Sequence, residues 1–266
     1  MTSPHGVDAA TIARHLDGLL KTDETPDYPQ AFNGLQLANR AVITRVAAAV
    51  DFSQRTIAAT IADDANLLLV HHGMFWDGAR RITGGLYDRL RPLSERDIAV
   101  YASHLPLDAH PVLGNNVLLA RELGLDPTAG FARYQALAIG VSGTVSSGQT
   151  LHTEELVGRV QQFAAQHGGN AIATTYDLQR LTRRWGVCTG AGASTETLRE
   201  ATALGIDTLI VGEGPHHTAV DAPEAGVVII YAGHYATETL GVRALAKEVE
   251  SVFGIPGTFV HAPTGL

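Results

Sequence analysis

The sequence has little of what marks secreted, thiol-based or membrane proteins. Cys188 is the only cysteine among 266 residues, so it can form no intramolecular disulfide and no zinc site built from several thiolates. No apolar run approaches the roughly 20 residues that cross a bilayer. The start, Met1 to Asp8, has neither the basic beginning nor the apolar core of a signal peptide. We therefore expect a soluble, cytoplasmic protein that has no membrane partner.

Positive charge is also scarce. The 19 Lys and Arg residues are outnumbered by 27 Asp and Glu residues, which gives a formal net charge of −8. The densest basic spot is the pair Arg183-Arg184, and a binder of nucleic acid needs a larger basic surplus to offset phosphate repulsion. We expect no nucleic-acid partner.

The composition is that of an ordinary globular chain, with 45% apolar and 17% charged residues. Short aliphatic runs alternate with helix-like segments that end in glycine, and no low-complexity linker divides them. This alternation predicts an α/β fold with mixed, largely parallel sheets. Strands are expected over residues 43–51, 66–70, 98–102, 137–144, 171–174, 185–189, 208–211 and 227–232, and helices over 55–63, 117–124, 154–167 and the segment that ends at Gly205.

A weak internal repeat relates the two halves of the chain, approximately residues 1–126 and 127–266. In the first half one strand is followed by His71-His72 and the next by His104, with Asp108 four positions later. In the second half one strand is followed by Gly212-Glu213 and the next by His234, with Glu238 four positions later. We interpret the chain as a duplicated unit.

Histidines that directly follow strands are the informative ones among the 12 in the chain, because ligands of α/β sheets gather at the carboxyl ends of strands. Adjacent residues of a strand point to opposite faces. His71 and His72 can therefore share a site only if the backbone leaves strand geometry, for which Gly73 provides an opportunity; the alternative is that one of them is a hydrogen-bonded core residue. Four other histidines are expected at the surface: His5, His15, His152 and His167.

The spacing of four residues brings His104 and Asp108, and likewise His234 and Glu238, onto one side of a helical or compact turn. Imidazole with carboxylate suits Fe, Mn, Co, Ni or Zn, whereas Ca and Mg prefer oxygen ligands only. If both carboxylates contribute, the natural arrangement is two divalent ions about 3.5–4 Å apart, which supply a hydroxide near neutral pH.

Other catalytic templates are missing from the sequence. It has no Gly-x-Ser-x-Gly elbow and no phosphate-binding loop that ends in Gly-Lys-Ser/Thr. The turn from Gly190 to Ser194 is interpreted as a tight strand-to-helix connection, although its amides could also receive an anion. Cys188 lies within an apolar strand, which favours packing over nucleophilic chemistry.

The motifs His71-His72-Gly73-Met74-Phe75-Trp76, Tyr101 to Asp108 and Gly233 to Glu238 resemble those of the NGG-one-interacting-factor-three-like family. Bacterial members of that family are often labelled GTP cyclohydrolase I type 2 homologues. The resemblance covers nearly the whole chain and includes Asn33 to Gln36, Asp51, Asn116 and Gly212-Glu213. Gly73 stands where a proline is usual and Leu105-Pro106 where Thr-Asn is usual, which alters the wall of the pocket rather than its ligands.

The resemblance implies a single family domain over residues 1–266, in two intertwined α/β halves with the C-terminal helix returning to the first half. It also implies a toroidal homohexamer and a dinuclear metal centre. The family's ligands carry over onto His71, His72, Asp108, His234 and Glu238, and His104 matches a further family histidine that is a ligand or lies directly behind one. Longer relatives carry an inserted domain between the halves, and this chain lacks it.

Three functions follow as hypotheses. The first is a metal-dependent hydrolase in which a metal-bound hydroxide attacks an unidentified small molecule; Glu213 is then the best candidate for an added acid/base group or for a partner that supports a ligand histidine. The second is a non-catalytic protein of metal handling or protein interaction. The third is a structural α/β protein with scattered histidines. No guanine or triphosphate site is recognisable in the sequence.

Overall fold

The fold is described from a computed structural model that covers residues 6–76, 78, 80–174, 177 and 179–266. The chain separates into two compact units. The first comprises Met1–Leu107 and Gly241–Ala262, and the second comprises Asp108–Leu240 and Pro263–Leu266. The chain passes from the first unit to the second within the short helix α4 (Leu105–Asp108).

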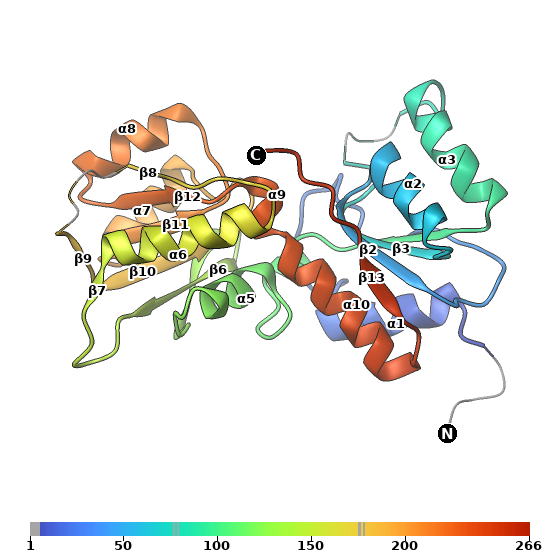
Figure 1. Ribbon diagram of the computed structural model, residues 1–266, viewed down its shortest axis with the longest axis horizontal. Coiled ribbons are helices and arrows are strands. Elements are labelled where there is room, and N and C mark those ends of the chain that lie inside the picture. Colours follow the sequence, from blue (N-terminus) through green and yellow to red (C-terminus); the bar gives the residue numbers. More distant parts are fainter. Residues whose placement is uncertain (1–5, 77, 79, 175–176, 178) are drawn as a thin grey trace. The chain divides into compact units, whose positions relative to one another are not determined.

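The first unit is a sheet covered by helices on both faces (Figure 1). Within the described residues its five strands lie in the order β1-β4-β3-β2-β13, and every pairing is parallel except that of β1 with β4. Helices α2 and α3 cover one face and α1 and α10 the other. The elements are β1 (Gly34–Leu37), β2 (Val46–Asp51), β3 (Leu67–His72), β4 (Ala99–Ala102), β13 (Gly257–Phe259), α1 (Ala9–Leu20), α2 (Gln54–Ala62), α3 (Gly85–Glu95) and α10 (Thr239–Phe253).

Alternation along the strands of this unit decides which helix each residue meets. Leu68 and Val70 pack with Leu93 of α3 in one apolar core. On the opposite face, Tyr101 of β4 is buried and donates a hydrogen bond from its hydroxyl to Asp17 of α1, at 2.9 Å. Both faces of the sheet are therefore buried, as the near-continuous apolar strands predict.

The second unit is built around a six-stranded sheet in the order β5-β6-β10-β11-β12-β8, among the residues described. The central pairs β10–β11 and β11–β12 are parallel, and the outer pairs are antiparallel. A short β7–β9 ladder lies beside it. The elements are β5 (Ala129–Tyr134), β6 (Leu137–Thr144), β7 (Leu151–His152), β8 (Ile172–Ala173), β9 (Leu181–Thr182), β10 (Arg184–Cys188), β11 (Thr208–Val211), β12 (Val228–Tyr231), α5 (Asn115–Glu122), α6 (Thr153–Gln166), α7 (Thr195–Ala203), α8 (His216–Glu224) and α9 (His234–Thr237).

Two apolar cores flank this second sheet. Ile210 and Ile230 pack with Phe163 of α6, whereas Leu209 and Ile229 pack into the core that includes residues of α7 and α8. The prediction of an α/β fold with mixed sheets is confirmed. Parallel pairing dominates the first sheet and the centre of the second.

The internal repeat is visible in the topology. The segment β2-α2-β3-α3-β4 of the first unit corresponds to β10-α7-β11-α8-β12 of the second, and neighbouring strands are parallel in both. The likeness extends to the first helix of each segment. The hydroxyl of Ser53 accepts a hydrogen bond from the amide of Thr56 at 3.2 Å, and that of Ser194 accepts one from Thr197 at 3.0 Å.

The two N-caps give a matched prediction about stability. Ser53→Ala and Ser194→Ala each leave a helix amide without its side-chain acceptor, so we expect each variant to lose about 1 kcal/mol of unfolding free energy. Chemical denaturation of the two variants measures this loss. A change below about 0.3 kcal/mol in either variant would show that its cap contributes little.

The histidines expected at the surface differ in their burial. His152 is exposed, but His167 is buried, with Nδ1 against the carbonyl of Phe163 at 2.9 Å, so its assignment to the surface was wrong. His5 lies outside the described residues.

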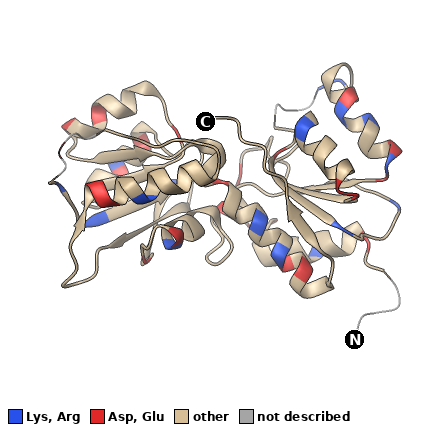
Figure 2. Cartoon of the chain, viewed as in Figure 1, with Lys and Arg blue, Asp and Glu red and all other residues tan. Residues whose placement is uncertain are grey.

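In the part of the chain that the structure covers, every helix falls short of a membrane span in length or hydrophobicity. Helices α3, α6 and α10 each carry both acidic and basic residues (Figure 2).

Candidate metal centre

Three histidines of the first unit converge at the carboxyl ends of β3 and β4. His71 and His72 are the last residues of β3, and His104 follows β4. Each offers a ring nitrogen, and the three nitrogens lie within 4.8 Å of one another. The ring centroid of His71 lies 4.8 Å from that of His72 and 4.9 Å from that of His104. This cluster of imidazoles is compatible with metal binding.

The backbone at His71-His72 differs from the expectation. Strand pairing continues to the end of β3, where His72 is registered with Asp51 of β2, so the backbone keeps strand geometry. The centroids of the two rings nevertheless lie only 4.8 Å apart, at the point where the strand ends. Neighbours on opposite faces of a strand can thus share a site when the strand stops directly after them.

Each of the three rings is held by an oxygen acceptor at Nδ1. His71 Nδ1 lies 2.9 Å from the carbonyl oxygen of Ser103, and His72 Nδ1 lies 2.8 Å from Asp51 Oδ1. His104 Nδ1 lies 2.8 Å from Asp27 Oδ1. Carbonyl and carboxylate oxygens only accept, so the proton of each neutral ring is on Nδ1 and the lone pair is on Nε2. Metal-binding histidines are held in this way.

Asp27 is a supporting residue that sequence reasoning missed. It accepts hydrogen bonds from the ring of His104, from the amide of Leu105 at 2.9 Å and from the side chain of Asn33 at 2.8 Å. Burial alone would raise the pKa of the Asp27 carboxyl, but these bonds and the charge of His104 outweigh burial and lower it. The carboxyl therefore stays ionised and fixes the ring of His104. No local pattern marks Asp27, since its partner lies 77 positions away.

In the second unit, α9 presents the predicted pair at the end of β12. His234 Nε2 lies 3.2 Å from Glu238 Oε2, which confirms that the spacing of four brings the two side chains together. His234 Nδ1 lies 2.7 Å from Glu213 Oε1. Burial disfavours the imidazolium of His234, but Glu238 and Glu213 outweigh it and raise the pKa of His234 to about 9. The two carboxylates around His234 therefore favour a positive charge between them.

Glu213 thus supports His234 in the way that Asp27 supports His104, since each carboxylate contacts Nδ1 of its histidine. Two roles were predicted for it, an acid/base group or a support for a ligand histidine, and its contact with Nδ1 favours the second. The two supporting residues are not equivalent positions of the repeat, because Asp27 precedes β1 whereas Glu213 lies shortly after β11.

Asp108, the third predicted ligand of the second unit, is buried. Its Oδ1 accepts a hydrogen bond from the side-chain amide of Asn115 at 2.8 Å. The side chain of Asn116 connects Asp108 to the next strands, since it donates to the Asp108 carbonyl at 3.3 Å and accepts from the amide of Thr189 at 2.8 Å. These contacts hold the carboxylate in one position.

Gly190 provides the room that Glu238 occupies. It has a φ of +62°, and a Cβ built on it would collide with Glu238 Oε1. Its amide donates to the hydroxyl of Thr237 at 3.1 Å. The amide of Ala193 donates to the Glu213 carbonyl at 3.1 Å. The segment Gly190 to Ser194 is thus a strand-to-helix turn that supports α9 and Glu213, which agrees with the first interpretation given above. The amides of Gly190 and Ala193 already donate hydrogen bonds within the protein.

Cys188 is excluded as a nucleophile. Its side chain is buried, and burial, together with the charges of Asp108 and Glu238, raises the pKa of the thiol far above its usual value.

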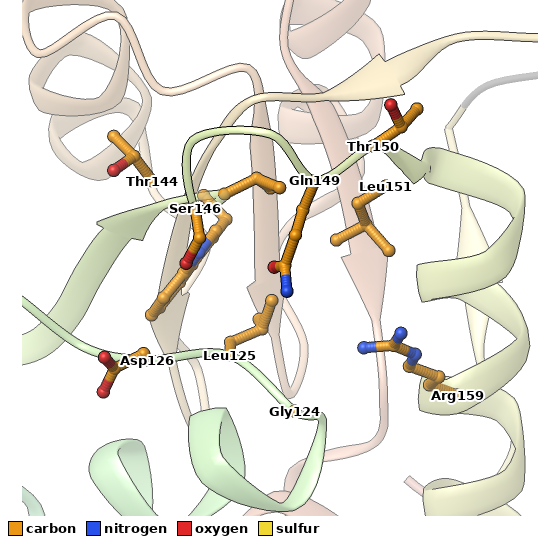
Figure 3. A pocket seen from close by; sticks show the side chains of 11 residues that line it. Gly124, Leu125, Asp126, Thr144, Ser146, Gln149, Thr150, Leu151 and Arg159 are labelled. Atoms are coloured by element: carbon orange, nitrogen blue, oxygen red, sulfur yellow. The ribbon is translucent and has the colours of Figure 1, made fainter.

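A cleft of about 390 Å³ elsewhere in the second unit contains none of the predicted residues (Figure 3). Its one arginine, Arg159, is bound to the Leu123 carbonyl at 2.8 Å and to Glu155 at 2.7 Å.

Known proteins of similar sequence share this fold and span nearly the same length. A GTP cyclohydrolase 1 type 2 homolog of Deinococcus radiodurans is 41% identical over 259 residues, which cover 96% of this chain and 93% of the relative. The solved structure of protein ybgI, described as of unknown function, has a TM-score of 0.86 at 29% identity and covers 98% of this chain and 100% of that one. The crystal structure of TTHA1606 from Thermus thermophilus has a TM-score of 0.80 at 31% identity, with coverage of 98% and 100%.

The family that these likenesses indicate is also matched directly. The model of the Duf34/NIF3 (NGG1p interacting factor 3) family matches residues 7–261, which is almost the entire chain. The resemblance noted in the sequence is thereby confirmed. The chain belongs to the Duf34/NIF3 family.

Proposed function

We propose that this protein is a metal-dependent hydrolase whose centre holds two divalent transition-metal ions. The ligands would be His71 and His72 of the first unit with Asp108, His234 and Glu238 of the second, and His104 would be a further ligand or the support of one. Zn, Fe, Mn, Co and Ni all accept such a mixture of imidazole and carboxylate. The family resemblance supports the pairing of the two ligand sets.

The observation that carries the proposal is the hydrogen bonding of four histidine rings. His71, His72, His104 and His234 each have Nδ1 at 2.7–2.9 Å from an oxygen acceptor. Three rings with the lone pair on Nε2, and a fourth, His234, held at Nδ1 by Glu213, fit an array of metal ligands, in which the second nitrogen is regularly bonded to a carboxylate or carbonyl.

The carboxylates complete the set. Asp108 and Glu238 are buried, and buried anions are expensive unless a positive charge compensates them. Two divalent cations would offset these charges, lower the pKa of a water molecule and act as Lewis acids toward the substrate. Asp27, Asp51 and Glu213 would keep the rings oriented and make them more basic.

Hydrolysis is the reaction class that this donor set supports best. The ligand set has more carboxylate and imidazole than a closed structural zinc site, and it includes no thiolate, since the sole cysteine is buried and burial raises the pKa of its thiol. The name of the Deinococcus relative places hydrolysis of a purine-type ring among the reactions to examine. Phosphoesters and amides are the other substrates that such centres attack.

A panel assay tests the proposal. The full chain, loaded in turn with Zn, Mn, Fe, Co or Ni, is incubated with GTP, phosphomonoesters, phosphodiesters and amides. We expect turnover that depends on metal and that falls in His234→Ala by more than the roughly 10–100-fold typical for loss of a residue that supports a ligand. The matched control is His152→Gln at an exposed position, which should keep full activity. Tight metal retention without turnover on any substrate would contradict the hydrolase and leave a metal-handling protein.

A further inference from the structure

Aromatic side chains stand against the histidine cluster of the first unit. The centroid of the Trp76 ring lies 4.6 Å from that of His104 and 5.2 Å from that of His72. The centroid of the Tyr28 ring lies 6.0 Å from that of His104 and 6.4 Å from that of Trp76. Tyr28 is 42% exposed, and Trp76 is partly exposed. Two aromatic residues that solvent reaches are therefore direct neighbours of the cluster.

The same two segments of the chain carry a second aromatic pair. The ring centroids of Phe32 and Phe75 lie 5.2 Å apart, and Phe32 is 65% exposed. The backbone of Phe32 has a φ of +48°, which is rare for a bulky residue and is found mainly where function requires it. Among the described residues, the exposed aromatic side chains are those of Tyr28, Phe32 and Tyr87. Two of these three thus belong to the segments beside the histidine cluster.

One side chain connects these two segments. Gln36 Nε2 donates a hydrogen bond to the Phe32 carbonyl at 2.9 Å, and Gln36 Oε1 accepts one from the amide of Met74 at 2.8 Å. Gly73 leaves the room for this bridge, because a Cβ built on it would collide with the side-chain amide of Gln36. The bridge holds in place a set of rings that we call the aromatic wall, namely Tyr28, Phe32, Phe75 and Trp76.

The chemistry of the aromatic wall indicates what it binds. Aromatic side chains attract a planar ring, through offset stacking and edge-to-face contacts, or a cation over their faces. Divalent ions held at the adjacent histidines would repel a cation, so the proposed metal centre favours a neutral planar ring. Because Tyr28 and Trp76 both contact the ring of His104, a ligand ring bound on them adjoins that centre.

We propose that the aromatic wall binds a planar ring of the substrate and so places a bond next to that ring at the His71, His72 and His104 cluster. This assignment rests on the proposed hydrolase function. It narrows the substrates to small molecules in which the hydrolysed bond adjoins an aromatic or heteroaromatic ring. In such a hydrolysis one water molecule is consumed: its hydroxide joins the attacked carbon or phosphorus, and its proton goes to the leaving nitrogen or oxygen.

Binding of two matched amides by the full chain tests this assignment. Benzamide and cyclohexanecarboxamide carry the same amide group, but only benzamide has a planar aromatic ring. Each is titrated into the metal-loaded protein and into the same protein after metal removal, and its dissociation constant is measured by ligand-observed NMR. We expect benzamide to bind about 2- to 10-fold more tightly than cyclohexanecarboxamide in both forms, because only its ring makes specific aromatic contacts.

Three variants locate this binding. Tyr28→Leu should bind benzamide about 2- to 10-fold more weakly than the unchanged chain. The matched control is Tyr87→Leu on α3, where the tyrosine is 50% exposed and lies outside the aromatic wall; it should stay within about twofold of the unchanged chain. Gly73→Ala should also weaken the binding although it removes no ring, because its methyl group displaces Gln36 from the bridge.

Equal affinity for the two amides, or equal benzamide binding by Tyr28→Leu and Tyr87→Leu, would overturn the assignment. A lower oligomeric state of Tyr28→Leu in analytical ultracentrifugation, with no benzamide binding by the unchanged chain, would overturn it in favour of a contact between protein chains. Metal content and turnover are measured separately. Benzamide binding to the metal-free protein without hydrolysis of any ring compound by the loaded protein would support the ring site and contradict the hydrolase.

Discussion

Glu238→Gln is expected to reduce the metal content of the purified chain from about two ions to one or fewer. Glu238 is 3% exposed and lies 3.2 Å from His234. Glutamine keeps the shape of the side chain but removes the charge that attracts a cation and the oxygen that would bridge two of them. Elemental analysis after exhaustive dialysis measures the effect.

The control for this result is Glu224→Gln, which removes the same charge from an exposed position on α8. It should retain the metal content of the unchanged chain. If Glu238→Gln also retains it, while both variants remain folded by circular dichroism, Glu238 does not hold metal. The pair with His234 would then be an ordinary buried ion pair.

Gly190→Ala is expected to lower both stability and metal content. The methyl group would collide with the Glu238 carboxylate, and the φ of +62° already disfavours any side chain at this position. We expect a loss of about 1 kcal/mol from the backbone and a further ~1–3 kcal/mol from overpacking. Because Glu238 must move to relieve the collision, bound metal should fall as well.

Gly205→Ala separates the two effects. Gly205 has a φ of +66°, and a Cβ there would meet nothing within 4 Å. The variant should therefore lose only the backbone contribution of about 1 kcal/mol and keep its metal. Thermal or chemical denaturation together with elemental analysis gives both quantities. Equal losses of stability and unchanged metal content in the two variants would contradict the role assigned to Gly190.

The strands at the centre of both sheets could be predicted because each is an aliphatic run buried on both faces. Thr208–Val211 was located from its residues alone, and β12 (Val228–Tyr231) and β3 (Leu67–His72) were located to within a residue or two. The edge strand β8 was predicted over residues 171–174, but the edge strands β1, β5 and β13 were missed. β13 (Gly257–Phe259) has only three residues, and its partner β2 lies about 200 positions earlier, so no local pattern distinguishes it from a loop.

Among the helices that were missed, α1 and α3 were missed for different reasons. α1 has a visible signal, since Asp8 caps it and Ile12, Leu16 and Leu20 recur at helical spacing on its buried side. α3 contains Pro92, which usually argues against a helix interior. Tertiary packing of its buried Leu86 and Leu93 outweighs that preference.

The residues of the candidate site also differ in how far the sequence could predict them. The pair His234 and Glu238 was predictable because local geometry decides the contact of residues that lie four apart in a helical turn; the contact of His104 with Asp108 stays a prediction. The residues that orient the rings were harder to find. Asp27 and Asp51 act on histidines 77 and 21 positions away, so only the folded sheet brings them together.

The most direct test of the central claim is anomalous X-ray scattering from crystals of the full chain loaded with one transition metal. The account predicts two strong anomalous peaks for each chain, at about 2.0–2.2 Å from nitrogen or oxygen atoms of His71, His72, Asp108, His234 and Glu238. Peaks located on other residues, or crystals of the loaded protein without a peak at His71 or His234, would contradict a dinuclear centre built from these side chains.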